Sequence, residues 1–303
     1  MNSLLKHGRG VKRAVDLDFT AGQFLLTGSA RADLVTSGWA GTGRIVRLAL
    51  WGLTQRELEG RGDDRTSLLD LAMNPEAGLP AVTDAPDFRV YVERALRGGL
   101  PQVATADSAA KRSRLLDAYV DQLVTRDVEL VGSRRNPALL RTALRAMALM
   151  VTERVPAYVG NRLNRLAKRP KRYLTEPSLL GPLLGIDERT ASRDIDVLGR
   201  LLDTYVAAQL RPLVELTSPR SRLLHLWDAN GEHEIDLIVD HPDGSVIACE
   251  VKASAAPDRS DARHLRWLAD RLGPLFRRGI VFHTGPRSFQ HDDDIWFLPI
   301  AAL

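Results

Sequence analysis

The stretch that decides the fold is EIDLIVDHPDGSVIACEVK, residues 234–252. Residues 234–239 and 245–252 are short apolar runs rich in β-branched side chains, as is typical of strands in a buried sheet. The dipeptide Asp243-Gly244 lies between them and favours a tight turn. We therefore predict a hairpin of two antiparallel strands.

Charged side chains interrupt these two apolar strands at positions that the hairpin would bring side by side. Side chains alternate between the two faces of a strand, so Glu250 and Lys252 share a face, and the turn brings Asp236 close to Glu250. Two adjacent carboxylates on apolar strands are costly unless a cation lies between them. Asp236 and Glu250 are therefore predicted ligands of Mg²⁺ or Mn²⁺, and Glu234 would contribute through water or lie at the rim. Lys252 would orient an attacking water or stabilise charge on a phosphate.

Residues 221–303 surround this hairpin with further α/β elements. The sequence predicts three more strands, at 222–226, 279–283 and 295–298. It also predicts one helix, at 257–271. The order Asp…Glu-x-Lys resembles the core of the restriction-endonuclease-like nucleases, in which Asp236, Glu250 and Lys252 would be the catalytic residues. The alternative is a solvated strand face, whose charges would form only weak ion pairs.

Residues 173–220 are predicted to form a winged-helix-like domain. Short helices are expected around Leu174, at 178–184 and at 188–202, followed by a strand at 205–212. In a winged helix the third helix can enter the DNA major groove, where Arg189 and Arg193 would contact phosphates or guanines. Acidic residues lie between these arginines, and many such domains pack only against protein, so DNA contact here stays open.

Residues 61–172 form a predicted helical region, with apolar residues three and four apart at 86–96, 109–130 and 137–155. The end of this region is a basic segment without any acidic residue: Arg162, Arg165, Lys168, Arg169, Lys171 and Arg172. Such a segment attracts nucleic acid, with Arg165, Lys168, Arg169 and Arg172 as candidate contacts, or else is a solvated linker.

Residues 1–60 alternate strands and helices. Strands are expected at 23–28 and 44–50, and Thr54 is a good N-cap for a short helix through Glu57. This alternation is typical of a parallel α/β sheet, and two strands amount to only part of one. The predicted fold class is therefore a multi-domain α/β protein with a partial sheet, a helical middle with a winged helix, and a C-terminal nuclease-like domain.

Six motifs together carry a wider resemblance: FLLTGSA (24–30), GGLPQV (98–103), LGIDERTASRDIDVLGRLLDTY (184–205), EIDLIV (234–239), VIACEVKAS (246–254) and LPI (298–300). They resemble a prokaryotic group of AAA-type ATPases fused to a C-terminal region of unknown function with a restriction-endonuclease-like end. The resemblance implies that residues 1–60 are the C-terminal part of an ATPase core, with Thr27 or Ser29 as the sensor and Arg44 following it. The nuclease-like triad would again be Asp236, Glu250 and Lys252.

The sequence departs from that group at its nucleotide site. No G-x-x-x-x-G-K-[ST] loop is found in the 303 residues, and the glycine-rich segment 38–44 lacks the lysine, so it is interpreted as an ordinary loop. The resemblance therefore implies an N-terminally truncated member without P-loop or Walker B strand. ATP is not an expected cofactor, and an ATPase partner or a homo-oligomer is a candidate assembly.

Composition excludes several classes of protein. Hydrophobic residues make up 44% and charged residues 26%, the balance of a soluble globular chain with net charge +4. No apolar run approaches the ~20 residues of a membrane helix, and no secretory signal is recognisable, so a cytoplasmic location without a membrane partner is expected. The single cysteine, Cys249, excludes an internal disulfide, and the histidines lack the i,i+4 spacing of a zinc site.

Two functions follow from these observations. The first is a DNA-associated protein that hydrolyses phosphodiester bonds with Mg²⁺ or Mn²⁺ and does not itself hydrolyse ATP. The second is a catalytically inactive module that binds DNA or protein. Metal binding would distinguish them, because an interaction module need not hold a cation.

Overall fold

The computed structural model describes the backbone of residues 11, 13–18, 20, 22–25, 27, 46, 48–64, 66–127, 137–150, 153–155, 157–158, 171–227 and 232–303. The chain divides into two compact units, residues 1–49 and 50–303. In the first unit, residues 11 and 13–17 are helical.

The strands predicted in the first unit are wrong for the residues that are described. Residues 23–25 and 27 have no regular secondary structure, and neither do 46 and 48–50. A strand is stable only when its backbone pairs with a neighbour, and no described segment of this unit provides one. Thr27 is exposed and irregular, whereas the other two sensor candidates, Ser29 and Arg44, lie outside the described residues.

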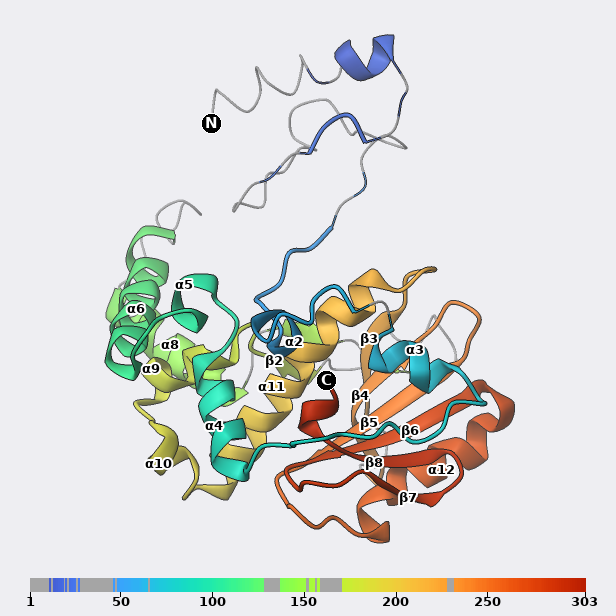
Figure 1. Cartoon of the computed structure of the whole chain (residues 1–303). Helices are drawn as coiled ribbons and strands as arrows, with labels where there is room; N and C mark the ends of the chain where they lie inside the picture. Colours follow the sequence, from blue (N-terminus) through green and yellow to red (C-terminus); the bar gives the residue numbers. More distant parts are fainter. Residues whose placement is uncertain are drawn as a thin grey trace. The chain divides into compact units, whose positions relative to one another are not determined.

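The second unit begins with helices, as predicted (Figure 1). They are α2 (Gln55–Leu58), α3 (Leu68–Met73), α4 (Phe88–Arg97), α5 (Pro101–Ala104), α6 (Ala109–Gln122), the π-helical turn η2 (Leu123–Asp127) and α8 (Pro137–Met150). Thr54 caps α2 in a reciprocal capping box with Glu57, which confirms the predicted start of that helix.

The glycine pair of the GGLPQV motif has a packing role. Gly98 ends α4 with φ 65°, a left-handed conformation that favours glycine. Gly99 lies against the backbone of Leu53, whose N–H donates to the Gly99 carbonyl at 2.7 Å. A Cβ on Gly99 would stand 2.4 Å from the Leu53 oxygen, so only glycine permits this close approach.

A small sheet and four helical segments follow. They are β1 (Glu153–Val155), its antiparallel partner β2 (Lys171–Tyr173), η4 (Pro177–Leu179), α9 (Leu180–Leu184), α10 (Glu188–Ala191) and α11 (Ile195–Leu216). The helix at 178–184 is confirmed, and Asp187 caps α10 as predicted. The single helix predicted at 188–202 is instead two helices, because the chain leaves α10 after Ala191 and Asp194 caps the start of α11. The helix expected around Leu174 is wrong, because β2 ends just before that residue.

The strand predicted at 205–212 is also wrong. Helix α11 runs unbroken through these residues for 22 residues, with Pro212 inside it. Its buried side chains keep the three- and four-residue spacing of a helix: Leu198, Leu201, Leu202, Tyr205, Val206 and Leu210. A short apolar run such as 205–210 does not by itself distinguish strand from helix. The strand on which the winged-helix interpretation rested is therefore part of α11.

The C-terminal part is a six-stranded mixed sheet in the order β3-β4-β5-β6-β8-β7. Its strands are β3 (Arg222–Trp227), β4 (Glu234–Asp240), β5 (Val246–Lys252), β6 (Phe276–His283), β7 (Phe289–Asp292) and β8 (Ile295–Pro299). The first three are antiparallel, β5, β6 and β8 are parallel, and β7 is antiparallel to β8. Five of these strands match the predicted ones, whereas the short polar strand β7 was not predicted.

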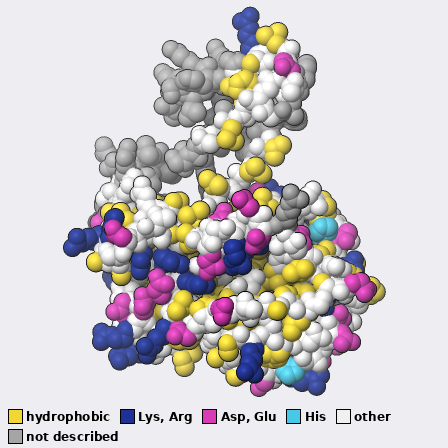
Figure 2. Space-filling view, in the orientation of Figure 1, with side chains coloured by type: hydrophobic (Ala, Val, Ile, Leu, Met, Phe, Trp, Pro, Cys, Tyr) yellow, Lys and Arg dark blue, Asp and Glu magenta, His cyan; other side chains and the backbone are white. Residues whose placement is uncertain are grey.

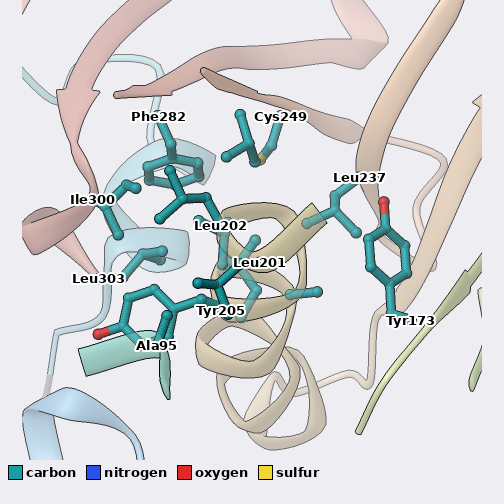
Figure 3. Close-up of a cluster of buried hydrophobic side chains, with 14 of the residues drawn as sticks. Ala95, Tyr173, Leu201, Leu202, Tyr205, Leu237, Cys249, Phe282, Ile300 and Leu303 are labelled. Carbon is teal, nitrogen blue, oxygen red and sulfur yellow. The ribbon is translucent and has the colours of Figure 1, made fainter. Parts of the chain in front are cut away.

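Helices cover both faces of this sheet. On one face, Leu201, Leu202 and Tyr205 of α11 pack with Cys249 and Phe282 (Figure 3). On the other face, Leu265 and Leu268 of α12 (Arg263–Leu272) pack with Ala248 and Val281. The 3₁₀ turns η5 (Arg259–Ala262), η6 (Gly273–Leu275) and η7 (Ile300–Ala302) complete the domain.

The architecture is therefore a mixed α/β fold, with helices in the N-terminal half and a mixed sheet in the C-terminal part. Burial of both faces explains why β5 carries almost no polar residue until its last three positions. None of the helices within the described residues has the length and apolar character needed to cross a membrane.

Candidate functional site

The hairpin of β4 and β5 forms as predicted. Gly244 has φ 90°, and the His241 N–H donates to the Ser245 carbonyl at 2.9 Å, closing the turn. The register pairs Leu237 with Cys249 and Ile238 with Ala248. Continuing that register by one residue places Asp236 opposite Glu250, in a central part of the sheet.

The strand on the other side of β4 carries an irregularity next to this site. The pairing of β3 with β4 shifts by one residue between Leu224 and Leu226. Such bulges often lie beside functional sites, where they change the direction of a side chain. Beyond this bulge, Glu234 pairs with Trp227 at the end of the ladder.

Asp236 is held at two points. Its Oδ2 accepts a hydrogen bond from the Val251 N–H at 3.0 Å, and its backbone carbonyl accepts one from the Tyr173 hydroxyl at 3.0 Å. Tyr173 is buried at the end of β2, next to Leu237 (Figure 3). The sequence analysis missed this contact of Tyr173, because nothing in KRY (171–173) marks the residue as a neighbour of β4.

Lys252 completes the cluster. Its Nζ donates to Oε2 of Glu250 at 3.2 Å. The structure therefore brings together Glu250, Lys252 and the carboxylate of Asp236, the three residues that the sequence analysis selected. The roles of these residues in chemistry remain predictions.

Glu250 is the unusual member of the cluster. Only 4% of its surface is exposed, and its Oε1 is buried without a hydrogen-bond partner. Burial first, and the negative charge of Asp236 second, raise the pKa of Glu250, while Lys252 acts in the opposite direction. A carboxyl in this environment favours its neutral form at neutral pH.

The same burial and charges shift the pKa values of two neighbours of Glu250. Burial lowers the pKa of Lys252, but the charges of Glu250 and Asp236 outweigh it, so the net direction is upward. Burial, followed by the charges of Asp236 and Glu250, raises the pKa of the Cys249 thiol. Cys249 is therefore an inert core residue on the opposite face of β5.

The donor set fits a hard divalent cation. Asp236 and Glu250 provide carboxylate oxygens, and a cation beside them would give the buried Oε1 of Glu250 a partner. Within the described residues, no three His, Cys, Asp or Glu side chains form a cluster able to hold a metal. The protein would thus contribute one or two carboxylates, the usual number for Mg²⁺, with water and phosphate completing the shell.

The predicted nucleic-acid contacts lie elsewhere in the chain. Arg165, Lys168 and Arg169 fall outside the described residues, and Arg172 lies in β2, with its backbone opposite Arg154. Arg189 and Arg193 are exposed on and just after α10, which packs against α4 and α11. Figure 2 shows basic and acidic side chains intermixed over this part of the surface. It is therefore not a uniformly basic face.

Comparisons with known proteins assign domains without an activity. Residues 198–303, which include most of α11 and the whole six-stranded sheet, match a domain of unknown function (DUF4143). Residues 89–155 match a second domain of unknown function (DUF8612). Neither match names an ATPase or a nuclease.

The chain is also similar to two mycobacterial proteins, the uncharacterized proteins Rv2008c of Mycobacterium tuberculosis and Mb2031c of Mycobacterium bovis. Each is 26% identical to it over 318 residues, which cover 94% of this chain and 64% of the relative. The chain thus spans less than two thirds of the length of these relatives. No solved structure matches it.

Proposed function

We propose that Asp236, Glu250 and Lys252 form a site of restriction-endonuclease-like type that hydrolyses phosphodiester bonds in nucleic acid with Mg²⁺ or Mn²⁺. The observation that carries this proposal is the burial of the Glu250 carboxyl beside both the Asp236 carboxylate and the Lys252 ammonium group. A buried carboxyl of this kind costs stability and persists where it serves a purpose. Adjacent to it are a second carboxylate and an ammonium group, the types of group that phosphodiester hydrolysis uses.

Each residue would have a separate role. Asp236 and Glu250 would hold the cation, which supplies positive charge beside the scissile phosphate when it is bound. The Val251 N–H and the Tyr173 hydroxyl keep Asp236 in place before any ligand arrives. Lys252 would orient the attacking water or stabilise the charge that develops on the phosphate.

Nucleic acid is the proposed substrate because the chain carries a dense basic segment. Arg165, Lys168, Arg169 and Arg172 fall within eight residues that contain no acid, and Arg189 and Arg193 are exposed nearby in sequence. Neutralising phosphates with such residues releases condensed counterions and favours binding of any sequence. ATP hydrolysis is not proposed for these 303 residues, since they contain no P-loop motif.

A specific observation favours a second candidate, a non-catalytic interaction module. Lys252 is paired with Glu250, and Asp236 accepts from Val251, so the cluster has internal partners without a cation. A site that has lost its chemistry would keep these contacts for stability alone.

A cleavage assay tests the proposal. The full chain is incubated with end-labelled single- and double-stranded DNA and RNA in Mg²⁺ or Mn²⁺. We expect cleavage that Lys252→Ala abolishes and that Lys111→Ala, a matched change at an exposed lysine of α6, leaves intact. Cleavage that persists in Lys252→Ala would contradict the assignment. If the chain neither binds Mn²⁺ nor cuts any substrate, the interaction module is the correct account.

A further inference from the structure

Two histidines that lie far apart in the sequence meet beside the sheet. His233 immediately precedes β4, and His264 is the second residue of α12. Their Nδ1 atoms are 3.2 Å apart, and their rings meet edge to face with centroids 5.5 Å apart. The sequence analysis found no site here, because it searched for histidines four residues apart on one helix, and these two are separated by 31 residues.

The orientation of His233 is fixed by stacking. Its ring lies parallel to the indole of Trp267, with centroids 3.9 Å apart and an interplanar angle of 13°. The guanidinium of Arg271, one turn further along α12, lies 4.7 Å from the centroid of the Trp267 ring. These contacts order one imidazole and the helix that carries the other, so little freedom would be lost on binding a ligand.

The spacing of the two nitrogens fits a bound transition metal. Ligand nitrogens at roughly 2.0–2.1 Å from a tetrahedral Zn²⁺ are separated by about 3.3–3.4 Å. The observed 3.2 Å is within a few tenths of an ångström of that value.

We propose that His233 and His264 together bind a borderline transition metal ion, such as Zn²⁺, Ni²⁺ or Cu²⁺, through their Nδ1 atoms. Imidazole nitrogens suit these borderline ions, whereas the carboxylate oxygens of Asp236 and Glu250 prefer harder ions. Within the described residues, no cluster of three His, Cys, Asp or Glu side chains could hold a metal, so we expect water or an external ligand to complete the coordination. The ion would join the start of β4 to the first turn of α12.

Titration of the whole chain with Zn²⁺, Ni²⁺ and Cu²⁺ by calorimetry tests this inference. We expect one saturable site with the order of affinity Cu²⁺ above Ni²⁺ and Zn²⁺, and no competition from Mg²⁺. His233→Ala and His264→Gln should each weaken binding by at least about tenfold, since loss even of a supporting partner of a metal ligand costs 10–100-fold. His291→Ala removes an exposed histidine of the same domain and should leave the affinity unchanged.

Further measurements distinguish loss of the metal site from loss of the fold and from failure of the proposed nuclease function. Circular dichroism confirms that each variant is folded, and Cu²⁺ electron paramagnetic resonance should show coupling to two nitrogens in the wild type and fewer in either variant. Binding must survive Glu250→Ala, so failure of the proposed nuclease function leaves this inference standing. Metal affinity that is the same in wild type, His233→Ala and His264→Gln would overturn it. Absence of binding would also do so, and the 3.2 Å contact would then be an ordinary hydrogen bond between two imidazoles.

Discussion

Replacing Glu250 by glutamine tests the electrostatics of the site directly. The amide has nearly the same shape as the carboxyl, but it cannot ionise. Because Glu250 is buried beside Asp236, its pKa in the folded chain lies above the ordinary value of 4.5. A raised pKa means that the associated stability is fully present below the ordinary pKa and is lost as the pH rises towards the folded pKa. The wild-type chain should therefore lose stability with increasing pH in this interval, and Glu250→Gln should not.

The size of the effect follows from linkage. Between the two pKa values the folded state holds about one proton more than the unfolded state, so stability falls by about 1.4 kcal/mol per pH unit. Over the two units from pH 5 to pH 7, the difference in unfolding free energy between Glu250→Gln and wild type should grow by about 2–3 kcal/mol in favour of the variant. A bound Mg²⁺ or Mn²⁺ favours the ionised carboxylate, so it should remove most of this difference.

Urea denaturation followed by circular dichroism at pH 5, 6 and 7, at constant ionic strength, gives the required free energies. Glu76→Gln makes the same chemical change at an exposed position and reports the effect of the substitution itself. A difference between Glu250→Gln and wild type that stays constant over this range would refute the reasoning. It would mean that Glu250 ionises as an ordinary surface carboxyl.

Three other predictions concern the rest of the chain. Gly99→Ala should lower the unfolding free energy by about 1–3 kcal/mol, because the added Cβ would clash with the backbone of Leu53. Gly78 has open space around it, so Gly78→Ala should be nearly neutral. Equal effects of the two substitutions in urea denaturation would contradict the packing argument. If the basic segment binds DNA, the combined alanine variant of Arg165, Lys168, Arg169 and Arg172 should bind every DNA sequence more weakly than the wild type. The slope of log affinity against log salt concentration should be shallower by about 3–4 in this variant. An unchanged slope would place the DNA surface elsewhere. ATP and ADP should not raise the melting temperature, and a saturable rise at sub-millimolar nucleotide would show a binding site that the sequence analysis overlooked.

The sequence predicted the C-terminal domain well because its signals are local. The turn at Asp243-Gly244, the apolar runs on either side and the alternation from Glu250 to Lys252 depend on neighbours along the chain. The hairpin made it the natural expectation that Asp236 lies beside Glu250, and the observed register, extended by one residue from Leu237 and Cys249, agrees with it. The site geometry then followed from two strands alone.

The errors have equally physical origins. The run at 205–210 is apolar enough for either a strand or a helix, and its packing within a 22-residue helix against β5 decided the outcome. Contacts between distant segments were out of reach, including the Tyr173 hydroxyl on Asp236 and the meeting of His233 with His264. In each case the partners lie on different elements, and only the fold brings them together.

Binding of Mn²⁺ by the wild type and three alanine variants tests the central claim most directly. Asp236→Ala and Glu250→Ala should each abolish binding measured by calorimetry or by the electron paramagnetic resonance of free Mn²⁺, since each removes one of the two proposed carboxylate ligands. Lys252→Ala should retain binding, because it removes a positive charge beside the ion, and Glu76→Ala should behave as wild type. Mn²⁺ binding that survives in both Asp236→Ala and Glu250→Ala, or a wild type that binds no Mn²⁺, would contradict the account.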